Sequence, residues 1–301
     1  MATKQRSRGR RPHVSRDRGP RYVAPVLDPN WQNPYSPSPS ERHHNQRVVR
    51  RFALRHRIPL TVAVELIGVA MLVAGFFTNL ALSAVGIIVA VGYAVFTQRD
   101  LRRYAERGQS LGALMLGAFD AGGDATERLR LVTVLDRLAA TFGVDNVSAF
   151  VVADQGYNAA LVPDGTNFSL FVTSAVMQDF ELIELEGVVA HLLARQRLGL
   201  LERESLASVS NLSDDARESL AGQGKTYRAD EVAAASIRYP LGLANALRKC
   251  ASQRVATNSF FATATYAQWR WVFFDQWSDR TESDLSDLDD VELRARALEE
   301  W

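Results

Sequence analysis

The sequence has little from which a metal site or a disulfide could be built. Cys250 is the only cysteine, so no internal disulfide can form and nothing requires an oxidising compartment. Of the five histidines, four precede residue 58 and only His191 follows it. No group of Cys and His has the spacing of a structural zinc site. A hydrolytic site with two imidazole ligands is therefore hard to assemble from residues 58–301.

Acidic residues are scarce at the N-terminal end. Residues 1–57 contain fourteen Lys and Arg against three Asp and Glu, a net charge of +11, which leaves −10 for residues 58–301 because the whole chain carries +1. Arg, Pro, Ser, Asn and Gln dominate this stretch, which predicts a disordered basic cytoplasmic tail over residues 1–57. Contact with anionic inner-leaflet lipid is the preferred role, a topology signal without a ligand is the next, and nucleic-acid binding is disfavoured.

Residues 58–97 form a long apolar run in which Glu65 is the only charged residue. A single helix of this length would extend about 60 Å, roughly twice the hydrocarbon thickness of a bilayer, so two crossings fit better. The polar pair Thr78-Asn79 marks the turn, which predicts transmembrane helices near residues 58–76 and 80–97. The glycines that offer close contact between them are Gly68, Gly75, Gly86 and Gly92.

Arginine clusters flank both ends of this run, and such flanks stay in the cytoplasm. The flanking residues are Arg50, Arg51, Arg55 and Arg57 before it and Arg99, Arg102, Arg103 and Arg107 after it. We therefore expect an integral multi-pass protein of the cytoplasmic membrane with both termini cytoplasmic. Glu65 is costly inside a bilayer, so a place within reach of the headgroups is favoured over a contact with another helix.

After a juxtamembrane linker at residues 98–124, the pattern predicts a mainly helical α+β domain over residues 125–301. The expected helices are at residues 125–142, 181 to 200 or beyond, 227–237, 241–251 and 291–301, and the expected strands are at residues 147–153 and 169–173. The two strands either form a hairpin or lie side by side. Residues 211–224 and 275–290 are expected to be solvated loops, and the aromatic run 269–274 is expected to be core or a packing surface.

Three motifs then occur in a suggestive order. They are Asn158-Ala159-Ala160-Leu161, Leu170-Phe171-Val172-Thr173-Ser174 leading into a helix with Val188-Val189-Ala190-His191, and Tyr227-Arg228-Ala229-Asp230. Their order and spacing resemble the HtpX-like, Ste-type membrane zinc metallopeptidases, whose helix carries HExxH and whose later helix carries Glu-Ala-Asp. The resemblance covers roughly residues 125–300 and the membrane hairpin, and it implies a zincin-like metallopeptidase domain with a small β-sheet.

The same resemblance implies that the zinc and catalytic positions have changed. HExxH holds zinc with two histidines four residues apart on one helix face, and its glutamate activates water. Here the five positions read His191-Leu192-Leu193-Ala194-Arg195, so a leucine stands at the base and an arginine at the second ligand. The third ligand position aligns with Arg228, whereas the aspartate of that motif is kept as Asp230. Arginine does not deprotonate to bind a cation, so no catalytic, cofactor or metal residue is assigned.

Two rearrangements of this site stay open. His191 could join Cys250 and Glu184 in an unorthodox zinc site, although hydrolytic zinc normally takes at least two His or Cys ligands. Alternatively, the two arginines could replace the charge of the metal by pairing with Asp230 or Glu184. A plain core histidine is the favoured interpretation of His191, and no serine or cysteine nucleophile is evident beside it.

The predicted function is that of a membrane-anchored pseudopeptidase, a non-catalytic protein that binds a protein partner or peptide, or regulates a true peptidase, without a cofactor. The alternative is an active zinc metalloendopeptidase with an unorthodox site at His191 that acts on membrane or misfolded proteins, so whether the chain is an enzyme is left open. A third possibility is a structural membrane protein whose basic tail does the work. The strand at residues 169–173 is expected to be a sheet edge that pairs with an extended peptide.

Overall fold

The structure is a computed structural model that describes residues 35–56, 58–115, 125–210, 212–222, 224–253, 255–276 and 285–301. Residues 1–34, which make up most of the expected basic tail, lie outside this range, as do residues 277–284 of the acidic stretch. All the elements named below belong to one unit, Tyr35–Trp301.

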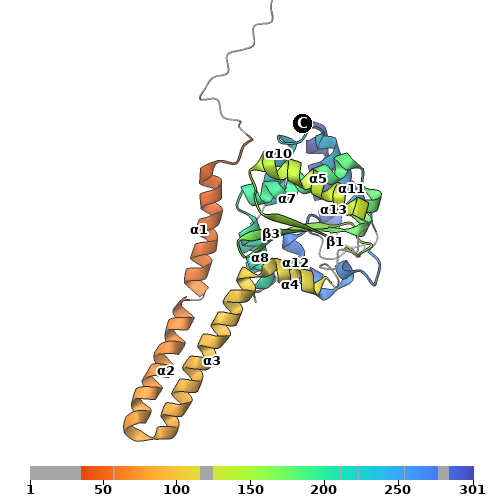
Figure 1. Cartoon of the computed structure of the whole chain (residues 1–301). Coiled ribbons are helices and arrows are strands. Elements are labelled where there is room, and N and C mark those ends of the chain that lie inside the picture. Colours follow the sequence, from red (N-terminus) through yellow and green to blue (C-terminus); the bar gives the residue numbers. More distant parts are fainter. Residues whose placement is uncertain are drawn as a thin grey trace, which may run out of the picture. The chain divides into compact units, whose positions relative to one another are not determined.

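Helices dominate the described chain, with one small sheet (Figure 1). The first helices are α1 (Pro39–His56), α2 (Ile58–Thr78), α3 (Leu80–Ala105), α4 (Arg107–Leu114) and α5 (Ala125–Phe142). The sheet and its following helix comprise β1 (Val147–Val152), β2 (Ala159–Asp164), β3 (Asn167–Thr173) and α6 (Ser174–Asp179). The C-terminal elements are α7 (Leu182–Arg197), α8 (Leu201–Val209), α9 (Asp214–Ala221), α10 (Lys225–Ala234), α11 (Pro240–Ser252), η1 (Phe260–Ala262), α12 (Ala264–Trp269), η2 (Arg270–Val272) and α13 (Leu285–Glu299). The prediction of a mainly helical chain with a small sheet is confirmed.

Helices α2 and α3 lie side by side as a hairpin (Figure 1). The side chain of Asn79 caps α3 by accepting a hydrogen bond from the backbone nitrogen of Ala81 at 2.9 Å. Close packing depends on glycine, because a Cβ added at Gly75 would lie 2.3 Å from a Ser83 backbone nitrogen. A Cβ at Gly86 would lie 2.7 Å from the Leu72 backbone nitrogen, and one at Gly68 would lie 3.0 Å from Ala90 Cβ. A Cβ at Gly92 would meet no described atom within 4 Å, so the close contact predicted at that glycine is wrong.

Both hairpin helices are long and apolar enough, by length and composition, to cross a membrane. Their large apolar side chains remain outside the protein interior, with Phe76, Phe77 and Leu80 each at least 78% exposed. So much continuous apolar surface is unfavourable in water. Helix α3 continues to Ala105, past the predicted end at residue 97, and α4 follows it, so much of the expected linker is helical.

The sheet has the strand order β1-β3-β2. β1 and β3 pair in parallel, so the predicted strands do lie side by side and not as a hairpin. The hairpin joins β2 to β3, with Gly165 at φ +62° in its turn, a conformation that glycine adopts without strain. β3 is therefore hydrogen-bonded on both sides, and the expectation that residues 169–173 form an edge strand is wrong. β1 is an edge, and β2 carries an isolated antiparallel bridge from Ala160 to Phe273.

Helix α7 is enclosed by α5, α10, α11 and the sheet (Figure 1). Every residue from Gly187 to Arg195 is buried, which is unusual for a helix with two ionisable side chains in that span. The crossing with α11 is close, since a Cβ at Gly187 would lie 2.7 Å from the Cα of Leu243. The predicted long helix ends at Arg197, and Gly199, at φ +73°, lies in the bend before α8.

The pattern predicts no folded structure before the membrane run, but residues 39–56 form α1, which packs on the domain. Val48, Val49 and Phe52 contact a small apolar cluster that includes Leu206 and Trp271. Asn45 is buried and donates a hydrogen bond from Nδ2 to the Leu198 carbonyl at 2.8 Å. The disordered tail predicted through residue 57 is therefore wrong over α1.

Two predicted loops also contain helix. Residues 214–221 of the expected polar loop form α9, whose Leu220 and Ala221 are buried. The C-terminal helix begins at Leu285, inside the acidic stretch, and ends at Glu299. The aromatic run 269–274 is core as expected, since Trp269, Val272, Phe273 and Phe274 are all buried. Helix α5 begins and ends where the periodicity predicts.

Candidate functional site

The positions that the sequence singles out on α7 lie on one face of a buried helix. His191 and Arg195 are four residues apart, so their side chains leave the same side of α7 one turn from each other. His191 is 0% exposed and Arg195 is 1% exposed. Such burial requires that every charge have a partner. Each side chain belongs to its own cluster.

The first cluster joins α7, α10 and α13. His191 Nδ1 lies 2.7 Å from Asp230 Oδ1, and Arg294 donates from Nε to Asp230 Oδ2 at 2.7 Å and from Nη2 to Oδ1 at 3.1 Å. The His191 and Phe274 rings are nearly perpendicular, at 85°, with centroids 5.3 Å apart. A carboxylate only accepts hydrogen bonds, so the proton of neutral His191 lies on Nδ1.

The electrostatics of this cluster keep the histidine neutral. Burial lowers the pKa of His191; Asp230 opposes the change, whereas Arg294 and Arg195 add to it. Burial alone would raise the pKa of Asp230, but Arg294 and His191 reverse this and hold it below its ordinary value. The cluster is therefore an arginine–aspartate pair with a neutral imidazole attached. His191 Nε2 is buried, and no atom of the described residues forms a hydrogen bond with it.

The second cluster surrounds Arg195 and joins α7, α8 and α10. Arg195 Nε donates to Glu204 Oε2 at 3.0 Å, and Nη2 donates to the same carboxylate. Its remaining hydrogen bonds run to backbone carbonyls of η2 and the residue after it, including Nη1 to Phe273 at 2.9 Å. Lys225 Nζ lies 3.2 Å from Glu204 Oε1 on the other side. One carboxylate thus serves two cations, and the guanidinium also holds the aromatic segment in place.

Glu204 stays ionised although it is fully buried. Burial by itself raises the pKa of this carboxyl, but the charges of Arg195 and Lys225 outweigh burial and hold the pKa below its ordinary value. The bidentate geometry is the strongest form of arginine–carboxylate contact. The position that the resemblance assigns to a second zinc ligand is thus filled by a satisfied internal ion pair.

The hypothesis that Arg195 and Arg228 pair with Asp230 or Glu184 is wrong for both arginines. Arg195 pairs with Glu204 and not with Asp230 or Glu184. Arg228 lies away from this face and pairs with Glu41 of α1 at 3.0 Å and with Glu231 at 2.8 Å. A guanidinium does neutralise Asp230, but it belongs to Arg294.

Glu184 lies at the other end of α7. It caps that end of the helix, because the Glu181 backbone nitrogen donates to Glu184 Oε2 at 2.7 Å, and Lys249 Nζ donates to the same oxygen at 2.6 Å. Seven residues of helix separate it from His191, about 10 Å along the axis. The imagined ligand set of His191, Glu184 and Cys250 is therefore not supported by this geometry.

A zinc ion fits this arrangement poorly. One imidazole nitrogen, His191 Nε2, has the lone pair and the orientation that a carboxylate on Nδ1 commonly gives a zinc-binding histidine. The motif position of the catalytic base is a fully buried Leu192, and that of the second ligand is the ion-paired Arg195. The guanidinium charges that lower the pKa of His191 would also repel a dication. Among the described residues, no group of three or more His, Cys, Asp or Glu is placed to hold a metal.

Three residues of these clusters escaped the sequence reasoning. Glu204 and Lys225 carried no motif, and Arg294 lies in the amphipathic C-terminal helix, where an arginine normally faces solvent. No signal within α8 marks Glu204, because Glu202 and Arg203 stand directly before it in the sequence. Asp230, His191 and Arg195 were singled out, and the structure brings the first two into contact.

Comparison of the chain with protein-family models, with curated proteins and with solved structures finds no match.

Proposed function

We propose that this is a membrane-anchored protein whose α2 and α3 cross the cytoplasmic membrane and whose termini are cytoplasmic. The length and exposed apolar surface of the hairpin support the first point. Helix α2 has 21 residues, about 31 Å at 1.5 Å per residue, which matches a bilayer core. The arginines on both flanks support the orientation.

We further propose that the remaining domain is a degenerate, non-catalytic relative of the HtpX-like metallopeptidases that binds a protein partner or peptide, or regulates a peptidase. The observation that carries this proposal is the ion pair of Arg195 with Glu204, one helical turn from His191. Zinc cannot use a guanidinium as a ligand, and Leu192 supplies no base. Such a domain could keep the fold and binding surface of a peptidase without its chemistry. Because β3 is the central strand, an extended peptide would pair with the edge strand β1.

The rival function is an active zinc endopeptidase, and the orphan Nε2 of His191 is the one observation that favours it. Purified full-length chain in detergent, incubated with casein and added zinc, separates the two. The proposal expects no cleavage above that of the His191→Ala variant. Cleavage that disappears in His191→Ala and on chelation would establish the peptidase instead.

A variant that restores the motif tests whether the residues at its base and second-ligand positions prevent zinc binding. Leu192→Glu combined with Arg195→His rewrites the segment as HExxH, and Glu204→Gln removes the carboxylate that this change would leave with only Lys225. If this triple variant folds and binds zinc while the natural chain does not, the two positions account for the difference. Zinc binding by both proteins alike would contradict the proposal.

A further inference from the structure

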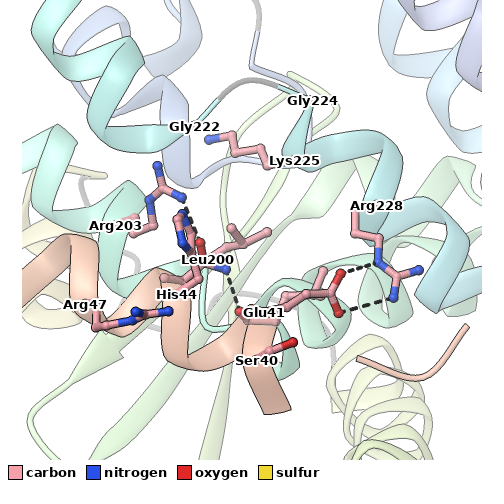
Figure 2. A pocket seen from close by; sticks show the side chains of 12 residues that line it. Ser40, Glu41, His44, Arg47, Leu200, Arg203, Gly222, Gly224, Lys225 and Arg228 are labelled. Atoms are coloured by element: carbon pink, nitrogen blue, oxygen red, sulfur yellow. Dashed lines mark hydrogen bonds and ion pairs between the residues drawn. The ribbon is translucent and has the colours of Figure 1, made fainter. Parts of the chain in front are cut away.

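A cavity of about 490 Å³ lies between α1 and the segment from the end of α7 to α10. This volume is within the range of sites that hold small molecules. Figure 2 shows side chains of α1 across the cavity from Lys225 and Arg228. The charged and histidine side chains that line it are Glu41, His44, Arg47, Arg203, Lys225 and Arg228.

The lining is strongly positive. Four of these side chains are arginine or lysine, and Glu41 is the only acid among the described residues that line the cavity. The Glu41 carboxylate is already engaged, because Arg228 donates to it from Nε at 3.0 Å and from Nη2 at 3.3 Å. His44 is exposed on α1 and lines the same cavity. The lining therefore carries a net positive charge, because its cations outnumber the single Glu41 carboxylate.

Lys225 is the deepest of these cations, with 6% of its side chain exposed. Its only charged contact among the described residues is Glu204, which Arg195 already holds in a bidentate pair. Among the described residues, the amine has the 3.2 Å ion pair with Glu204 and lies 5.3 Å from the centre of the Trp271 ring, but no hydrogen bond to it has good geometry. Burial, partly offset by Glu204 and reinforced by Arg195 and Arg203, lowers the pKa of Lys225 to about 8. A second negative group near this amine would relieve the excess positive charge.

Arg203 is also buried, and its hydrogen bonds run to neutral acceptors. Nε donates to the Leu220 carbonyl at 2.8 Å and Nη1 donates to Asn45 Oδ1 at 2.7 Å. In the described part of the chain, no ion pair joins Arg203 to a carboxylate; Asp215 and Glu218 line a separate hollow beside it. Burial lowers the pKa of Arg203, and Glu204 only partly opposes this. A buried arginine that no carboxylate contacts directly is costly, even with acids nearby.

We propose that this cavity binds a soluble small molecule that carries phosphate groups. Guanidinium groups hold phosphate oxygens in pairs, and a lysine adds a point charge. The cavity also borders the N-terminal end of α10, where backbone N–H groups and the helix dipole favour an anion. This inference stands on the cavity and its charges, and it is independent of the loss of zinc chemistry.

The phosphate of a lipid headgroup offers the same chemistry, but the cavity is badly placed for it. His44 precedes the first residue of α2 by fourteen positions, about 21 Å of helix. If α2 crosses the bilayer, a headgroup would have to leave the membrane surface to reach the cavity. A soluble ligand needs no such displacement.

The test uses full-length protein in nanodiscs of phosphatidylcholine, titrated calorimetrically with inorganic diphosphate at low and at high salt. We expect saturable binding to one site, weakened roughly tenfold or more by Lys225→Met and several-fold by Arg47→Ala. Arg50→Ala is the matched control, since Arg50 is exposed on the same helix and does not line the cavity. It should change the dissociation constant less than about twofold.

Several results would overturn the inference. Absence of saturable binding at millimolar diphosphate would do so, and so would equal weakening by Arg47→Ala and Arg50→Ala, which indicates general attraction to a basic helix. Nanodiscs containing a phosphoinositide form the second arm: if these lipids compete with diphosphate and the competition is lost in Lys225→Met, the ligand is a headgroup and the soluble-ligand proposal fails. Should Lys225→Met not fold, the comparison of Arg47→Ala with Arg50→Ala decides.

Discussion

Replacing Arg195 by alanine should destabilise the protein far more than the same replacement at Arg228. Arg195 is 1% exposed and faces a fully buried Glu204, so its loss leaves a carboxylate with Lys225 as its remaining cation. Removing one member of a buried ion pair costs about 3–5 kcal/mol. The backbone carbonyls that Arg195 binds also lose their donor, at about 1 kcal/mol each. Lys225 offsets part of this, so we expect a loss of about 4 kcal/mol.

Arg228 is the natural control because both changes are Arg→Ala. It pairs with two carboxylates, but its side chain is 27% exposed and those of Glu41 and Glu231 are 36% and 49% exposed. Ion pairs at such positions are worth about 0–1 kcal/mol. At about 2–4 °C per kcal/mol for a domain of this size, Arg195→Ala should lower the melting temperature by roughly 8–16 °C and Arg228→Ala by less than about 4 °C.

The melting of full-length protein in detergent can be followed by tryptophan fluorescence, since Trp269 and Trp271 are buried beside the Arg195 cluster. A double-mutant cycle sharpens the result: Arg195→Met together with Glu204→Gln should cost less than the sum of the single changes by about 1–3 kcal/mol. Equal melting temperatures for Arg195→Ala and Arg228→Ala, or strict additivity in the cycle, would refute the argument that Arg195 and Glu204 form a strongly coupled buried ion pair.

Other consequences can be measured on the same full-length protein. The folded pKa of His191 lies below its unfolded value of 6.5, so its contribution to stability is complete above that pH and declines as the pH falls. His191→Gln should therefore reduce the dependence of the melting temperature on pH between about pH 7.5 and 5. An unchanged dependence would count against a neutral buried imidazole. Gly86→Leu should disrupt the hairpin, because an added Cβ would lie 2.7 Å from a backbone nitrogen, while Gly92→Leu should be tolerated; similar thermal stability of the two variants in lipid would contradict the packing. A cysteine at Asn79 should react with a membrane-impermeant maleimide added outside intact cells, and one at Ser110 should not; the reverse pattern would exclude the proposed orientation.

Elements whose signal is local could be predicted from the sequence. The apolar spacing of residues 125–142 and the following Gly143, at φ +60°, are properties of one segment, and α5 has the predicted bounds. The turn at Asn79 is likewise local, since its own side chain caps the next helix. The aromatic run 269–274 is buried because its side chains have a large apolar area, a property that is visible in the sequence itself.

Elements that depend on distant partners could not be predicted. Helix α1 is polar and basic, and its attachment depends on contacts such as Asn45 with the Leu198 carbonyl, 153 residues away. β2 includes Pro163, which weakens its strand signal, and it is completed by pairing with β3. The central place of β3 follows from a parallel partner that precedes β2 in the chain.

The same limit applies to the ion-pair clusters. Glu204 lies nine residues after Arg195, which would separate them by about 13 Å along a continuous helix. They meet because the chain bends between α7 and α8, where Gly199 has φ +73°. Spacing within a helix could place Arg195 beside His191, but it could not supply the partner of either residue.

The most direct test of the central claim is the metal content of the purified full-length protein, measured by mass spectrometry after equilibration with zinc and removal of excess ion. The ion pair of Arg195 with Glu204 predicts that the natural chain and His191→Ala retain the same trace of zinc, well below one equivalent. Close to one equivalent in the natural chain, lost in His191→Ala, would contradict it.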